Sequence, residues 1–207
     1  MLDLYSHATP NRRKASTKSE EKLMETEIVR LHREGERAES LRRFAEEYQA
    51  RLLALARRLL GNHEDAPDAL QEILIQVDQS LPKFTGESSL YTWACRLATN
   101  VCLNYQRKLG RTNSNAPLDE AVRDAILLPV ARSDDNPDTS CRSRFRQHLV
   151  EQALLKLPET QRAVLVLSDL EDMAAAEIAE LLQTNVNVVK SRLHRARANL
   201  KRTVEKE

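Results

Sequence analysis

A basic stretch near the C-terminus has the residue types that bind a polyanion. From Thr184 to Arg202 the chain carries six Lys or Arg, one His and no acid. Helical spacing places four apolar residues on one face: Val189, Leu193, Ala196 and Leu200. The opposite face then presents Lys190, Ser191, His194, Arg195, Arg197 and Lys201. Cations on such a face hold phosphates, and its N-terminal side chains reach base edges in a major groove.

A short helix and a polar turn precede this basic helix, which is the pattern of a helix-turn-helix unit. Alanines in residues 175–179 permit the close helix crossing that the unit requires. Asn185 or Asn187 in the turn can contact adenine or a phosphate. Gln183 stands where many such turns use glycine, which predicts strain at that residue. The alternative is an exposed basic helix that has no DNA partner.

Two further segments of the chain segregate charge. Residues 62–80 hold five acids and no Lys or Arg, whereas residues 88–118 hold no acid but several cations, Arg96, Arg107 and Lys108 among them. An acidic face suits a basic protein surface, and an acid-free face suits a polyanion. Solvated helix faces are the alternative interpretation of each run.

Apolar residues at spacings of three and four predict four helices between Leu23 and Leu109. Gly35 separates the first two, and Gly61 ends the second. The third extends to about Ser80, with Asn62 or Asp65 as its cap and Pro67 in its first turn. A loop follows over residues 81–89. The fourth helix, over residues 91–109, is expected to bury Leu97, Val101 and Tyr105.

The spacing of prolines and glycines divides the chain into two parts. Residues 111–139 contain three prolines and two polar runs. A segment of this length without a helical pattern is too long for a connection within a compact domain. We therefore predict an all-α protein with two small helical domains joined by a flexible linker. The predicted ranges are a disordered basic tail over 1–22, a helical domain over 23–110, the linker over 111–139 and a second helical domain over 140–207. Helices of the second domain are expected over 140–157, 159–169, 173–182 and 188–204.

Composition excludes several classes of protein. No window approaches 18 apolar residues, and the N-terminus lacks an apolar signal core, which predicts a cytoplasmic protein. The five histidines are scattered, and the chain has no HExxH motif, phosphate loop or nucleophile elbow, so we expect neither an enzyme nor a metal or cofactor. Cys95 and Cys102 lie too far apart on one helix for a disulfide. These two and Cys141 are expected to be two semi-buried side chains and one exposed thiol, and a redox role stays open.

Several runs of residues resemble a known family. Residues 157–164 (LPETQRAV), 177–182 (EIAELL) and 189–197 (VKSRLHRAR) closely resemble region 4 of bacterial extracytoplasmic-function (ECF) sigma factors. Residues 65–73, 84–93 and 96–100 resemble region 2 of the same family. The two matches occur in the family's order with a linker between them. They cover about residues 23–110 and 140–204.

The resemblance implies a non-catalytic subunit that binds core RNA polymerase and directs it to promoter DNA. The residues at the family's core-polymerase-binding positions are Asp68, Gln71 and Glu72. Those at its −10 DNA-binding positions are Thr85, Gly86, Ser88, Trp93, Arg96, Asn100, Asn104 and Arg107. Those at its −35 DNA-binding positions are Asn187, Lys190, Ser191, His194, Arg195 and Arg197.

Some alternatives remain at this point. Trp93 can equally be a core residue, and Asn100 an internal hydrogen-bonding residue. A helix-turn-helix regulator that acts without polymerase is the alternative function, and dependence on core polymerase separates the two. The resemblance also implies control by an anti-sigma factor, with sequestration at the inner membrane face. The identity of that partner, the promoter and the role of the N-terminal tail are not determined by the sequence.

Overall fold

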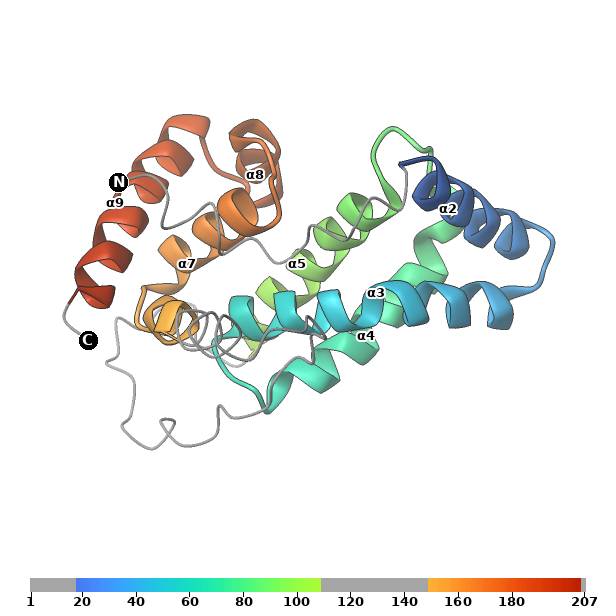
Figure 1. Cartoon of the computed structure of the whole chain (residues 1–207), viewed down its shortest axis with the longest axis horizontal. Helices are drawn as coiled ribbons and strands as arrows, with labels where there is room; N and C mark the ends of the chain where they lie inside the picture. The colour runs from blue at the N-terminus through green and yellow to red at the C-terminus, as the bar shows by residue number, and fades with distance from the viewer. Residues whose placement is uncertain (1–17, 109–148, 206–207) are drawn as a thin grey trace, which may run out of the picture. The chain divides into compact units, whose positions relative to one another are not determined.

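The computed structural model describes residues 18–108 and 149–205, and all regular secondary structure in these ranges consists of helices, which are joined by loops (Figure 1). The first range contains α2 (Lys18–Arg33), α3 (Arg37–Leu60), α4 (Asp65–Ser80), the 3-10 helix η1 (Leu81–Lys83) and α5 (Leu90–Lys108). The second contains a helical stretch over 149–155, then α7 (Glu159–Leu165), the π-helix η4 (Val166–Leu170), α8 (Ala175–Leu181) and α9 (Val186–Val204).

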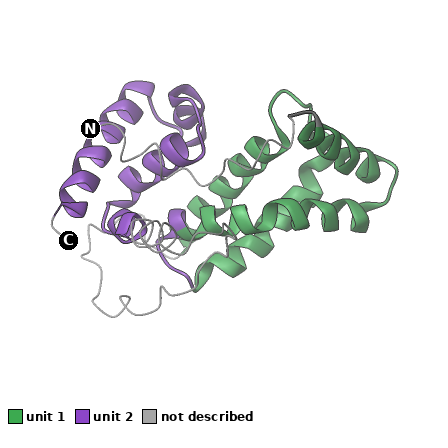
Figure 2. Cartoon of the chain, viewed as in Figure 1, with its two compact units in different colours: residues 1–57, 64–108 green, residues 58–63, 109–207 purple. Residues whose placement is uncertain are grey.

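The chain forms two compact units (Figure 2). Unit 1 comprises residues 1–57 and 64–108, and unit 2 comprises residues 58–63 and 109–207. The last turn of α3 therefore groups with the second unit. The linker predicted over 111–139 and Cys141 lie outside the described residues. No helix within the described ranges is long and apolar enough to cross a membrane.

Unit 1 buries one face of each of its helices. The largest fully buried side chains include Ile28 on α2, Phe44 and Tyr48 on α3, Ile73 on α4 and Leu90 on α5. Within α3 and α4 the buried apolar residues recur at spacings of three and four, which is the apolar stripe that packs an amphipathic helix onto a core. As predicted, α2 ends before Gly35, α3 ends before Gly61 and α4 ends at Ser80.

Three details of the prediction for this unit are wrong. The tail predicted over 1–22 is helical from Lys18, because α2 begins there with Glu20 and Glu21 in its first turn, where acids suit the helix dipole. Glu64 occupies the N-cap of α4 and makes no side-chain cap bond, so neither Asn62 nor Asp65 is the cap. On α5 the fully buried face carries Ala94, Cys95, Ala98 and Cys102, with Val101 beside it, and leaves Leu97 and Tyr105 only half-buried.

Unit 2 packs α7, η4, α8 and α9 around a small core. Its buried members are Val164, Leu167, Met173, Ile178, Ala179 and Val189. The helix predicted over 159–169 changes to a π-helix at Val166, and the helix predicted from Met173 begins at Ala175. The last helix begins at Val186, two residues earlier than predicted. Asn185 accounts for this early start, since its side chain accepts a hydrogen bond from the Asn187 amide at 2.8 Å and caps α9.

Candidate nucleic-acid interface

The outward face of α9 presents the side chains that the sequence predicted. Val189, Ala196 and Leu200 are buried, and Leu193 packs against the same core. Because these residues fix the rotation of the helix, the predicted −35 residues all lie exposed: Asn187, Lys190, Ser191, His194, Arg195 and Arg197. The helix contains six Lys or Arg and no acid. The N-terminal half of the face therefore combines donors and positive charge at the end of the helix that the Asn185 cap fixes.

The turn before α9 closes α8 with a left-handed residue. Gln183 has a φ of +49°, so the prediction of strain there is confirmed. Its amide donates to the Glu180 carbonyl oxygen at 3.1 Å, and the Thr184 amide donates to the Ala179 carbonyl oxygen at 2.8 Å. These two bonds form a Schellman motif, which usually has glycine at the left-handed position. The motif sets the direction in which the chain leaves α8 and enters α9.

Arg197 differs from the other exposed cations of α9. Its Nη2 and Nε donate to the two carboxylate oxygens of Asp169 on η4, at 2.6 and 3.0 Å. The Asp169 side chain is only 10% exposed, so the pair is partly shielded from water. The guanidinium therefore joins α9 to η4, and a DNA contact by Arg197 stays a prediction.

The loop between η1 and α5 is open and accessible. Thr85 and Gly86 are exposed, and Ser88 is half-buried with its hydroxyl donating to the Ser89 carbonyl oxygen at 3.3 Å. Gly86 has a φ of +79°, and a Cβ added there would meet no atom within 4 Å. The glycine is thus required by its backbone conformation, and the space beside it is free to receive another group.

The predicted −10 residues of α5 lie on one side of the helix. With a turn of 3.6 residues, Trp93, Arg96, Asn100, Asn104 and Arg107 fall within an arc of roughly 80°. Asn100, Asn104 and Arg107 are exposed, whereas Trp93 and Arg96 are half-buried. The Trp93 ring contacts the Phe84 ring of the loop at a centroid distance of 5.4 Å and an interplanar angle of 58°. Trp93 is therefore neither a core residue nor free, since it ties the loop to the helix.

The acidic helix α4 divides its carboxylates between two sides. Asp68, Gln71 and Glu72 are exposed on one face, which also carries the half-exposed Ile75. The buried face consists of Ala66, Ala69, Ile73 and Val77. An exposed apolar side chain beside acids suits the docking of a basic protein surface.

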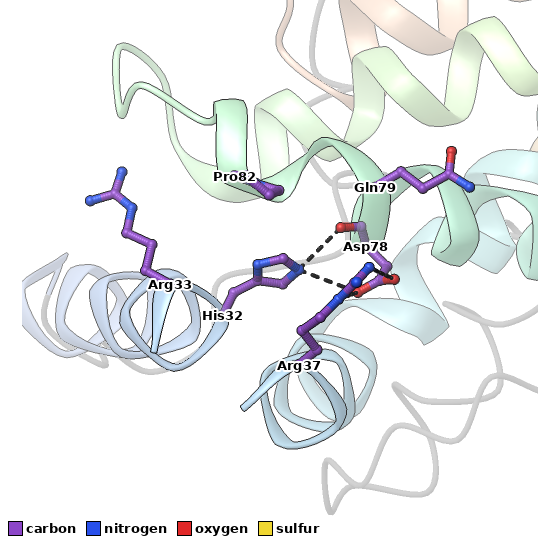
Figure 3. A pocket seen from close by; sticks show the side chains of 6 residues that line it. All are labelled: His32, Arg33, Arg37, Asp78, Gln79 and Pro82. Atoms are coloured by element: carbon purple, nitrogen blue, oxygen red, sulfur yellow. Dashed lines mark hydrogen bonds and ion pairs between the residues drawn. The ribbon is translucent and has the colours of Figure 1, made fainter. Parts of the chain in front are cut away.

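Asp78, at the end of the same acidic run, has partners inside unit 1 (Figure 3). The Arg37 guanidinium donates to its carboxylate at 2.7 Å, and Nε2 of His32 lies 3.3 Å from Oδ1. Burial raises the pKa of Asp78, but Arg37 and His32 outweigh that effect and hold the pKa below its ordinary value. Asp78 is therefore a structural acid, and the exposed part of the acidic run ends before it.

No group of three or more His, Cys, Asp or Glu side chains in the described part of the chain is arranged to hold a metal ion. Cys95 and Cys102 are both fully buried, more so than the sequence indicated. Burial raises the pKa of the Cys102 thiol to about 12.

Comparison with known proteins connects these faces to a family. The family model "Sigma-70 region 2" matches residues 44–112, and "Sigma-70, region 4" matches residues 147–200. The ECF RNA polymerase sigma-E factor of Escherichia coli K12 is 30% identical over 159 residues, which cover 76% of this chain and 83% of that protein. The chain belongs to the ECF sigma factors of the sigma-70 family. The ECF RNA polymerase sigma-E factor of Haemophilus influenzae is 29% identical over 188 residues, which cover 89% of this chain and 97% of that protein.

The fold of this sigma factor also resembles a solved structure. The sigma factor RpoE in complex with the anti-sigma factor NepR from Bartonella quintana aligns with a TM-score of 0.59 and 20% identity, covering 79% of this chain and 96% of that one.

Sequence reasoning missed three contacts of this sigma factor. Phe84 was not expected to contact Trp93, and Asp169 was not expected to hold Arg197. Glu25 was placed in no role, although its carboxylate accepts from the Leu90 amide at 2.9 Å. The Glu25–Leu90 pair is 65 residues apart in sequence, so no local pattern could reveal it. Asp169 is the only charged residue of η4, and it was the available signal for the second contact.

Proposed function

We propose that this sigma factor docks on core RNA polymerase with the exposed face of α4 and directs initiation from promoters with −10 and −35 elements. The docking face consists of Asp68, Gln71 and Glu72. These side chains lie exposed on one side of α4, and the structure shows no internal ion pair for them within the described residues. Their charge is the complement of a basic polymerase surface.

The observation that carries the proposal is the acid-free face of α5, which begins where the open loop ends. A separated strand exposes bases, and a protein captures one by admitting it beside loop backbone and polar side chains. Thr85, Gly86 and Ser88 line the loop that receives the base. Along α5, Trp93 and Asn100 contact the strand, and the cations Arg96 and Arg107 hold phosphates. Asn104, whose oxygen accepts from Arg107 at 2.9 Å, orients that guanidinium.

The second DNA face is α9, which enters the major groove of the −35 element. Asn187, Lys190 and Ser191 lie in its first turn and a half, where a recognition helix contacts base edges. His194 and Arg195 follow on the same exposed side. Arg197 stands at the far end of this face and contributes positive charge while bonded to Asp169.

The domain ranges proposed for these roles are 23–110 for polymerase binding and −10 recognition and 140–207 for −35 recognition, joined by a linker over 111–139. The RpoE structure holds a sigma factor of this fold bound to an anti-sigma factor. We therefore infer that an anti-sigma factor controls this chain too, by covering the faces of α4, α5 or α9. In this proposal the protein acts in the cytoplasm, and the anti-sigma factor sequesters it at the inner membrane face.

The test is transcription by purified core polymerase on a library of promoter fragments, with and without this protein. Transcripts that start at a fixed distance from shared −35 and −10 motifs, and only when the protein is added, support the proposal. Binding of duplex DNA without polymerase, with no dependent transcripts, would show instead a helix-turn-helix regulator.

Variants separate the two DNA faces. Lys190→Ala is expected to weaken the −35 contact about tenfold, as loss of a base contact does. Lys201→Ala is the matched control, because it removes the same charge from the same helix about 16 Å further along its axis. Asn100→Ala should leave duplex −35 binding intact and lower strand opening at −10. Equal effects of Lys190→Ala and Lys201→Ala would show that α9 contributes only general positive charge.

A further inference from the structure

The first amides of α5 donate hydrogen bonds to side chains from two places in the chain, the loop residue just before α5 and helix α2. The first amides of a helix have no partner within it and need external acceptors. Ser89 supplies one, since its hydroxyl accepts from the Thr92 amide at 3.0 Å. The amide of Leu90, the first residue of α5, donates instead to Oε1 of Glu25 on α2 at 2.9 Å. A carboxylate at this end of a helix also interacts favourably with the helix dipole.

The other end of α2 holds the chain just before the loop. His32 is buried, and its Nε2 lies 3.1 Å from the Asp78 carbonyl oxygen as well as 3.3 Å from Oδ1 (Figure 3). Both neighbours are acceptors, so Nε2 carries the proton and donates. Pro82 of η1 lies beside this imidazole in the same open pocket. α2 therefore contacts the end of α4, and it also packs against η1.

A third bond fixes α2 between these two points. The buried Ser40 hydroxyl on α3 donates to the Ile28 carbonyl oxygen at 2.7 Å. Glu25 and His32 lie seven residues apart, or two helical turns, and so face the same side of α2. The segment of chain between their partners, from Asp78 to Leu90, contains η1 and the loop over 84–89. α2 thus holds the chain on both sides of the loop, through His32 before it and Glu25 after it.

Both contacts come from a helix that the family model does not cover. The match to region 2 begins at residue 44, after the whole of α2. The loop that α2 holds contains Thr85, Gly86 and Ser88, and Trp93 stands one turn into α5 against Phe84. A displacement of the α5 N-terminus would move that ring pair and the space beside Gly86 together.

We propose that α2 acts as a brace for the −10 recognition loop, meaning that it holds both ends of the loop in place. Glu25 is the positioning residue, because its bond to α5 fixes the backbone geometry where the loop meets that helix. This inference rests on the proposed function, in which that loop captures a base of the melted strand. Glu25 does not touch DNA in this account. It acts by keeping the loop backbone and the first turn of α5 in the geometry that admits the base before the strand arrives.

The test measures binding of the reconstituted holoenzyme to two probes. One is a fork with a single-stranded −10 segment bearing a fluorescent base analogue, and the other is a −35 duplex. Glu25→Ala is expected to weaken binding of the fork about tenfold, the size of a lost helix cap of about 1.4 kcal/mol. Glu25→Gln keeps an acceptor oxygen without the charge and should lose about threefold. Binding of the −35 duplex should stay unchanged in both variants.

A spectroscopic measurement separates positioning from overall folding. Trp93 is the single tryptophan of the chain, so its fluorescence reports the loop–helix junction alone. We expect Glu25→Ala to change the Trp93 emission and its quenching at temperatures where the helical circular dichroism is intact. Glu21→Gln is the control, because it removes a negative charge one turn away on α2 from an exposed side chain.

The outcomes distinguish this inference from the function beneath it. Asn100→Ala is measured on the same fork. If Asn100→Ala weakens the fork complex and Glu25→Ala does not, the brace is wrong and −10 recognition stands. If neither variant weakens it, both proposals fall. Equal losses on the fork and on the −35 duplex would mean that Glu25 serves only general stability, which also overturns the brace.

Discussion

The turn between α8 and α9 offers the sharpest test of the local physics, through the substitution Gln183→Gly. Gln183 occupies the left-handed region at a φ of +49°, which costs an L-residue with a Cβ about 1–2 kcal/mol. Glycine removes that cost, but it loses more backbone entropy on folding, and this loss destabilises the folded state by about 0.5–1 kcal/mol. The side chain is exposed, so its loss removes little packing. The net expectation is a gain of about 0.5–1 kcal/mol in the stability of unit 2.

Hydrogen exchange read by mass spectrometry on the full-length protein measures this gain locally. Amides of α8 and α9 that open together should exchange about two- to fivefold more slowly in Gln183→Gly. Gln183→Ala is the control, because it shortens the side chain and keeps the Cβ, so it should gain nothing. Asn tolerates the left-handed region better than most residues and should fall between them. If Gln183→Ala gained as much as Gln183→Gly, the strain would not lie in the backbone and this reasoning would be refuted.

Three further predictions concern other residues. Because burial holds the pKa of Cys102 at about 12 and Cys95 is also buried, both thiols should react with a disulfide reagent only as fast as the protein opens, and an immediate reaction of either one in a native Cys141→Ser variant would contradict the burial. Asp169→Asn and Arg197→Ala should each lower the free energy of unfolding by about 1 kcal/mol, and a double variant no less stable than either single one in urea titrations would confirm that they act as a pair. Burial raises the pKa of Glu25 above 4.5 against the lowering effect of the Leu90 amide, so the folded state binds a proton more readily than the unfolded chain. Wild type should therefore gain stability relative to Glu25→Gln as pH falls from neutral through the raised pKa toward 4.5, and urea midpoints that keep a constant difference across that range would count against it.

Local sequence patterns predicted most of the helices of this sigma factor, because each rests on information within one or two turns. Val189, Ala196 and Leu200 fixed which side of the last helix is buried, and hence which side carries Lys190 and Arg195. Gly35 and Gly61 marked helix ends, since chain reversal there needs no distant partner. The strain at Gln183 was also readable, because the backbone conformation of a Schellman turn is a local property.

Only the tertiary structure decided which charged and aromatic side chains are used inside the protein. Asp78 belongs to the same acidic run as Asp68, but His32 on α2 and Arg37 on α3 bind it, so Asp78 is structural and Asp68 is exposed. Arg197 has the same type and helical spacing as its neighbours, yet Asp169 lies 28 residues away in sequence and binds it. Glu25 caps a helix that begins 65 residues later. Such partners are brought together by packing of the helix faces, and the spacing of residues along one helix carries no record of what the next helix places against it.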